Sequence, residues 1–202
     1  MKKMLILGLL LVIVSTVCFA APTVNGPTGL IKSPSADSLA AGEFDLALHN
    51  YNKTNILTFN LGLAKGFEAG VSARNRDNSN SARGFLKYTI VPERSGQIGI
   101  AVGARASSNY TSFFVVGSKY LPEIGVRGHL GMETVGNGTF FVSASKALPS
   151  KQAFPKMIAM GEFYGGELNL GLRMLLTRDV NLDLCLMDLS GAMIGLGFHS
   201  SF

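Results

Sequence analysis

Charged side chains alternate with apolar ones along most of this chain, at the spacing of residues that share one face of a β-strand. On that face stand six cations and five acids: Arg74, Arg83, Lys87, Arg105, Arg127 and Arg173, with Asp45, Glu68, Glu133, Glu167 and Asp183. Because the two signs nearly balance, these side chains can pair across an enclosed lumen. Rings of charged side chains also select ions in channels. The set therefore predicts either a charged constriction or a salt-bridged interior that only stabilises the fold.

The expected constriction contains Arg105, Arg127 and Glu133. The full set of side chains that we expect in the lumen is Arg74, Lys87, Arg105, Arg127, His129, Glu133 and Asp183. The sequence has no basic cluster with interleaved aromatic residues, so nucleic acid is not an expected partner.

Histidine occurs in two patterns that could carry chemistry. His49, His129 and His199 fall on separate segments, and their spacing matches no metal-site signature. His199 and Ser201 share one face, and this H-x-S spacing resembles the catalytic pair of outer-membrane lipid A deacylases. A catalytic serine needs a base in hydrogen-bond reach and a third group that orients the base, and the sequence identifies no such acid. We therefore predict no enzyme activity, metal or cofactor; a lipid-modifying barrel enzyme is the third hypothesis for function.

Twelve β-strands are predicted from Glu43 onward, where period-two alternation begins and turn residues recur at short intervals. They span residues 43–51, 55–65, 67–76, 82–91, 97–106, 111–120, 124–134, 138–147, 156–164, 167–175, 179–189 and 191–202. Short separators such as Gly136-Asn137-Gly138 favour hairpins and hence an antiparallel meander. Strands of about 9–11 residues are long enough to cross a bilayer when tilted.

The face opposite the charges is almost wholly apolar. Periodicity cannot say whether such a face points to lipid or to a soluble core. Three features favour lipid: only 15% of the residues are charged, glycines are frequent on the polar face, and the chain ends on an apolar strand. We predict an all-β, transmembrane, up-and-down barrel of about twelve strands. The alternative is a soluble secreted or periplasmic β domain that binds a ligand or partner.

Two further features concern individual strands. Residues 111–120 and 156–164 are apolar on both faces, so their orientation stays open. The last strand carries Phe198 and Phe202, and this ending resembles the C-terminal signal of outer-membrane barrels. The outer-membrane assembly machinery and the lipid bilayer are therefore expected partners.

The first twenty residues have the pattern of a cleaved signal peptide. Lys2 and Lys3 precede an apolar core, and Cys18-Phe19-Ala20 is a small-x-small cleavage site. Lipidation of Cys18 and an uncleaved anchor helix are the alternatives. Without Lys2 and Lys3 the formal net charge falls from +5 to +3, and Cys185 is left with no disulfide partner. Residues 21–42, rich in Pro, Ser and Gly, are predicted to be an irregular segment, either a plug or periplasmic, and residues 43–202 the barrel.

The sequence Gly29-Leu30-Ile31-Lys32-Ser33-Pro34-Ser35-Ala36-Asp37, followed by Gly42-Glu43-Phe44, resembles the opening of the YjbH-type outer-membrane proteins. Gly62-Leu63-Ala64-Lys65-Gly66-Phe67-Glu68-Ala69-Gly70 is similar to a hairpin common in that group. The resemblance covers a minor part of the chain, and the known members are several times longer. It implies an association with exopolysaccharide production and polysaccharide as a partner. We expect an integral protein of the bacterial outer membrane that acts as a narrow pore or an envelope component.

Overall fold

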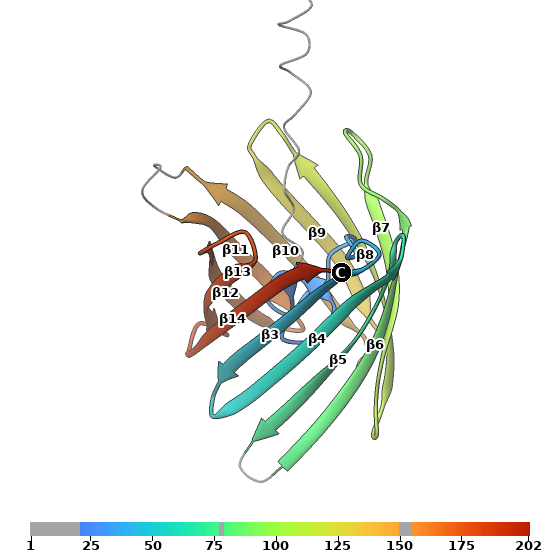
Figure 1. The fold of residues 1–202 in the computed structure, drawn as a ribbon, viewed down its shortest axis with the longest axis vertical. Coiled ribbons are helices and arrows are strands. Elements are labelled where there is room, and N and C mark those ends of the chain that lie inside the picture. The colour runs from blue at the N-terminus through green and yellow to red at the C-terminus, as the bar shows by residue number, and fades with distance from the viewer. Residues whose placement is uncertain (1–20, 77–78, 150–154) are drawn as a thin grey trace, which may run out of the picture.

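The computed structural model describes residues 21–76, 79–149 and 155–202, so the signal peptide predicted for residues 1–20 lies outside the described part. Twelve antiparallel strands close into one barrel (Figure 1): β3 (Glu43–Tyr51), β4 (Thr54–Ala64), β5 (Phe67–Arg76), β6 (Ser79–Val91), β7 (Gly99–Ser107), β8 (Thr111–Leu121), β9 (Val126–Glu133), β10 (Thr139–Leu148), β11 (Lys156–Tyr164), β12 (Glu167–Leu175), β13 (Val180–Met187) and β14 (Gly191–Ser201). Strands adjacent in sequence pair with each other, and β14 closes the barrel on β3 with Leu196 opposite Leu48. The predicted up-and-down barrel is confirmed.

The strand boundaries follow the turn residues, and they differ from the predicted ones by at most three residues. Asn52 and Lys53, between β3 and β4, have φ angles of 46° and 60°. Both positive angles are what a two-residue type I′ hairpin turn requires. No helix in the described part of the chain is long and apolar enough to span a membrane.

Apolar side chains cover the outside of the barrel, and polar side chains point inward. On β3, Leu46 and Leu48 are 43% and 51% exposed, whereas Asp45 and His49 are buried. The same outward exposure runs around the wall at Val71, Leu86, Ile100, Leu130, Phe140, Leu170, Leu184 and Ile194. An apolar belt of this extent needs lipid around it, as in transmembrane β-barrels. The outward orientation of the apolar side chains contradicts the alternative of a soluble β domain, in which the apolar face would lie in a core.

The structure also orients the two strands that are apolar on both faces. On β8, Phe113 and Val115 face outward, while Phe114 and Val116 are buried inside. On β11, Glu162 points inward and is buried. These two strands therefore place apolar residues in the lumen, next to the polar ones.

Three inward phenylalanine rings lie over glycines of the neighbouring strand. The register pairs Gly70 with Phe85, Gly103 with Phe114 and Gly131 with Phe141. A Cβ added at any of these glycines would lie 2.3–2.5 Å from a ring atom. The glycines predicted on the polar face thus make room for aromatic rings in a crowded interior.

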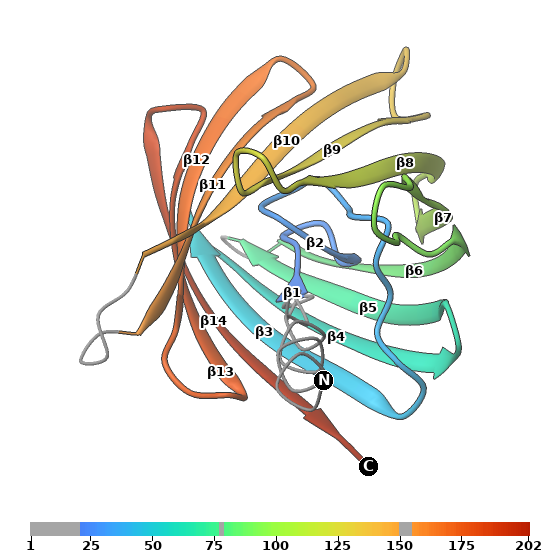
Figure 2. The same ribbon diagram turned by 90° about the horizontal axis from the view of Figure 1, so that it is seen from above.

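Residues 21–42 form a segment that we call the plug, and residues 21–39 of it are buried or half-buried inside the barrel (Figure 2). Within this segment, β1 (Ala21–Pro22) and β2 (Thr28–Gly29) pair as a two-stranded sheet, a regular element that the prediction of an irregular segment did not include. The tight turn after β2 depends on Gly29, because a Cβ there would lie 2.1 Å from the carbonyl oxygen of Ser33. The plug leaves the lumen beside β4, where the Gly42 N–H donates to the Gly62 carbonyl at 2.9 Å.

Candidate functional site

A carboxylate on the barrel wall binds the middle of the plug. Glu162 of β11 accepts a hydrogen bond from the Lys32 backbone N–H to each of its oxygens, at 2.9 and 3.0 Å. Its Oε2 also accepts from the Ser33 backbone N–H at 2.9 Å and from the Ser33 hydroxyl at 2.7 Å. Asn169 of β12 donates to Oε1 at 2.9 Å and orients the group. One buried side chain therefore satisfies three donors of the plug, each by a charge-assisted hydrogen bond.

A second carboxylate, Glu68 of β5, holds the plug where β2 begins. Its Oε1 accepts from the Thr28 N–H at 2.9 Å, and its Oε2 accepts from the Thr28 hydroxyl at 2.7 Å and from the Leu39 N–H at 3.3 Å. The charge is balanced by Lys87 of β6, whose Nζ lies 3.1 Å from Oε2. Lys87 also donates to the Thr28 carbonyl at 3.1 Å and to its hydroxyl. The ion pair thus supplies both a donor and acceptors to one residue of the plug.

Arginines of the wall donate to plug carbonyls. Arg173 of β12 donates from Nη2 to the Leu30 carbonyl at 3.2 Å and is held by Asp183 of β13 at 2.8 Å. Arg74 of β5 donates from Nη2 to the Val24 carbonyl at 3.1 Å. Buried backbone groups outside a sheet need such partners. The polar side chains of the lumen therefore supply hydrogen-bond partners for the backbone of the plug, which has little secondary structure of its own.

Where the plug runs toward β3, it is held by a different set of groups. Arg127 of β9 binds both carboxylate oxygens of Asp37, with Nη2 2.7 Å from Oδ1, and its Nε donates to Glu93 at 2.9 Å. The Ser118 hydroxyl of β8 accepts from the Ala36 N–H at 2.8 Å. Polar contacts thus extend along the plug from Val24 to Leu39.

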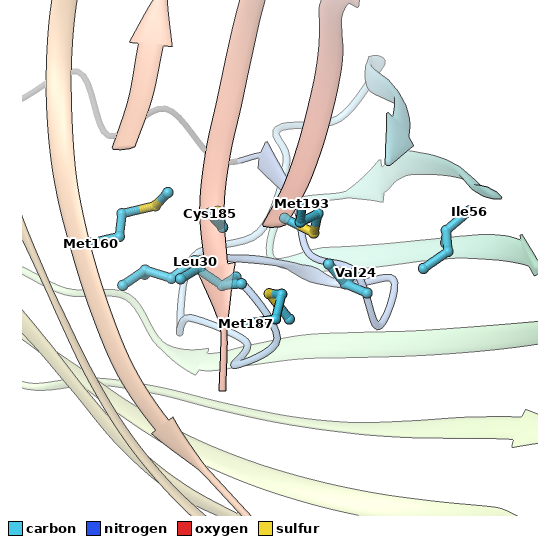
Figure 3. Packing of buried hydrophobic residues seen from close by; sticks show 8 residues of the cluster. Val24, Leu30, Ile56, Met160, Cys185, Met187 and Met193 are labelled. Carbon is cyan, nitrogen blue, oxygen red and sulfur yellow. The ribbon is translucent and has the colours of Figure 1, made fainter. Parts of the chain in front are cut away.

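Apolar contacts complete the fit of the plug (Figure 3). Side chains from the plug and from inward positions of β4, β11, β13 and β14 pack into one buried cluster: Val24, Leu30, Ile31, Ile56, Met160, Cys185, Met187 and Met193. Cys185 is buried and is a packing residue of this cluster. The apolar inward residues of β11 thus have a partner in the plug.

The seven residues predicted to line the lumen do face inward, but they are spread along it. Arg105 and Glu133 form a buried ion pair with Nη1 2.5 Å from Oε2. Arg127 lies six residues before Glu133 on β9, which is about 20 Å along the strand. Arg127 therefore does not join this pair, and the three residues do not form one constriction. Of the other predicted residues, His129 hydrogen-bonds through Nδ1 to Ser118 at 2.7 Å.

The most important contacts of the plug involve residues that the sequence did not identify as site residues. Thr28 and Ser33 belong to a segment with no period, and nothing in the sequence indicates their wall partners. Glu162 could have been identified from the sequence, because it is the only acid in a predicted strand, residues 156–164, that is apolar on both faces. A lone buried acid in such a strand needs a partner.

A cavity of about 320 Å³, which we call the vestibule, lies between the plug and the end of the barrel that is remote from Ser201. Its lining includes five cations, one acid and three tyrosines: Lys32, Arg74, Arg76, Arg83, Arg105, Glu133, Tyr51, Tyr110 and Tyr164. Val24 and Asn25 of the plug form part of its floor. The Arg83 guanidinium lies 5.2 Å from the centre of the Tyr110 ring, within the range of a cation–π contact.

The structure places an acid where it can orient the histidine of the H-x-S pair, which the sequence did not identify. His199 Nδ1 lies 2.7 Å from Asp45 Oδ1, on the strand paired with β14. Among the hydrogen bonds of the described residues, none joins His199 to Ser201, so a base–nucleophile pair is not assembled there. Within the same residues, no three His, Cys, Asp or Glu side chains are grouped to hold a metal ion.

Comparison with protein-family models found no match, and no curated protein matches the sequence. Among solved structures, the KdgM porin is similar in fold, with a TM-score of 0.56 and 12% identity over 79% of this chain and 99% of the porin chain. The same porin in complex with disordered oligogalacturonate gives a TM-score of 0.55 at the same identity and coverage. Omp33 of Acinetobacter baumannii gives 0.46 at 10% identity, over 79% of this chain and 97% of that one. The likeness to KdgM shows that this chain has the fold of a porin barrel.

Proposed function

We propose that this protein is a narrow pore of the bacterial outer membrane whose lumen is closed by its own N-terminal segment. The observation that carries the proposal is the burial of the contacts between plug and wall. Glu68 and Glu162 are 0% and 2% exposed, and Thr28 and Ser33 of the plug are buried against them. Solvent does not reach these groups, so a solute passes this level only when the plug moves.

The chemistry of the lumen supports a plug that moves, as opposed to a permanent core. Many contacts between wall and plug are hydrogen bonds to wall side chains, and water can replace these when the segment leaves. A twelve-stranded barrel has room for a narrow channel once such a segment is removed. The plug joins β3 through Gly42, whose φ of 84° and open surroundings suit a hinge.

The outer-membrane location and the kind of solute belong to the same proposal. The apolar belt and the porin fold support an outer-membrane barrel. One structure of the KdgM porin contains oligogalacturonate, an acidic sugar. The YjbH-type resemblance implies an association with exopolysaccharide. Both favour a carbohydrate as the transported or bound molecule.

A reversible lock tests the gate. Ser33 of the plug and Ser143 of β10 have hydroxyl oxygens 2.8 Å apart, so a Ser33→Cys/Ser143→Cys variant, with Cys185→Ala to remove the native thiol, should form a disulfide after small adjustments. In planar bilayers the oxidised protein should be silent, and reduction should restore opening events. Each single-cysteine variant is the matched control. Equal conductance before and after reduction would show that the plug is not the gate, and silence in both states would favour an envelope component without a pore.

A further inference from the structure

We infer that the vestibule binds carboxylate-bearing oligosaccharides. The inference deepens the proposed function, since it names the class of solute that meets the closed pore. Binding itself does not require the plug to move.

The first argument is the charge of the vestibule. Lys32 and Arg105 are paired with Glu167 and Glu133. Arg74, Arg76 and Arg83 have no acidic partner within salt-bridge distance among the described residues. Three uncompensated cations therefore line one concave cavity, and such a cavity concentrates anions because its walls focus the field.

The second argument is the arrangement of these cations. Arg74 and Arg76 are two residues apart on β5, so they share the inward face. Arg83 projects from β6, where it pairs with Ser72 of β5. The three guanidinium groups thus lie on a wall two strands wide. Guanidinium is a planar fork that binds carboxylate through two parallel hydrogen bonds, so a row of them suits a chain with a carboxylate on successive units.

The third argument is the aromatic surface, which favours a sugar over a small inorganic anion. Tyr51, Tyr110 and Tyr164 line the same cavity from β3, the turn before β8, and β11. Tyrosine offers a flat apolar ring with a polar edge, a surface suited to ligands with both characters. A volume of about 320 Å³ lies at the small end of ligand sites, which span roughly 300–1,000 Å³, so the vestibule holds only a short part of an oligosaccharide.

The position of the site connects it to the plug. Arg74 lines the vestibule and also donates to the Val24 carbonyl and to Asn25 Oδ1, both in the plug. A carboxylate bound to Arg74 competes with these two acceptors. A ligand in the vestibule therefore contacts both the wall and the segment that closes the lumen.

Calorimetric titration of the mature chain, folded in detergent, tests the inference with trigalacturonate as the probe. The test variant is Arg76→Gln/Arg83→Gln, which keeps the polar side chains and removes two cations. The matched control is Arg178→Gln, an exposed arginine in the turn between β12 and β13, at the other end of the barrel. Two comparison ligands separate the contributions to binding. Maltotriose is an oligosaccharide without charge, and inorganic phosphate is an anion without a sugar.

The expected result is binding of trigalacturonate that weakens by about tenfold or more in the double variant and is unchanged by Arg178→Gln. Maltotriose and phosphate should each bind at least about tenfold more weakly than trigalacturonate. Absence of trigalacturonate binding, or equal binding by the double variant, would overturn the inference. Phosphate binding as tight as trigalacturonate would mean a simple anion site and would also overturn it. The disulfide lock is measured without any sugar, so the two proposals fail separately.

Discussion

Replacing Glu162 by Gln should loosen the plug while leaving the barrel intact. The carboxylate of Glu162 serves the Lys32 N–H, the Ser33 N–H and the Ser33 hydroxyl. The amide keeps only one oxygen. If that oxygen replaces Oε1, the Ser33 N–H loses its acceptor and faces the new NH2 group. If it replaces Oε2, the Asn169 amide loses its acceptor and the new NH2 group faces the Lys32 N–H. In either orientation two buried donors are left unpaired. Each buried donor left unpaired costs about 1–3 kcal/mol. The carboxamide is also easier to bury than the carboxylate, which offsets part of this cost.

The net effect is about 3 kcal/mol on the closed position of the plug, from two unpaired donors less the relief of desolvation. Since about 1.4 kcal/mol corresponds to a factor of ten, opening of the plug should become roughly a hundredfold more frequent. Amide hydrogen exchange in lipid nanodiscs measures this opening directly. Exchange should accelerate at Ser33, Ala36 and their neighbours, and should stay unchanged in the barrel strands.

Glu123→Gln is the matched control for this experiment, because Glu123 is an exposed acid in the turn between β8 and β9. It should leave exchange of the plug unchanged. Unchanged exchange in Glu162→Gln would refute the role of this carboxylate. Equal acceleration in the plug and in the barrel strands would also refute it, since the variant would then destabilise the barrel as a whole.

Three further predictions follow from single contacts. Gly29→Ala should raise hydrogen exchange in the plug alone, because the added Cβ meets the Ser33 carbonyl at 2.1 Å; accelerated exchange in the strands would contradict this. Lys87→Met should lower the unfolding free energy, measured by urea titration in vesicles, by roughly 3–5 kcal/mol, because Glu68 stays buried without its cation. Adding Glu68→Gln should recover part of that loss, and no recovery would argue against the ion pair as the cause. Deleting Phe202, which is 91% exposed, should reduce assembly in cells but not refolding into detergent, and equal yields in cells would refute its role as an assembly signal.

The sequence predicts the barrel because alternation and turn chemistry are local. Strands such as β3 and β12 coincide with the predicted ranges 43–51 and 167–175. Where the prediction differs, the cause is also local. β6 begins at Ser79, three residues before the predicted start, because Asn80 continues the ladder opposite Asn75 of β5.

The partners inside the lumen could not be predicted, because they depend on which strands lie opposite one another and on how the plug runs between them. Glu162 and Ser33 are 129 residues apart in the chain. Arg127 and Glu133 lie on the same face, as predicted, but the rise along β9 separates them. The sequence does not predict which face of β8 and β11 points inward, for a similar reason. Their inward apolar residues are explained only by contacts with the plug and with other inward side chains.

The central claim is that residues 21–42 lie inside the barrel in the membrane. Spontaneous disulfide formation between Ser33→Cys and Ser143→Cys in cells tests it most directly, because the periplasm is oxidising. The account predicts that folded barrel extracted from membranes without added oxidant already carries this disulfide. A Ser33→Cys/Ser72→Cys pair should stay reduced, because Ser72 is a buried inward residue of β5, which lies five strands away from β10 around the barrel. Folded barrel with free thiols at residues 33 and 143 would contradict the account.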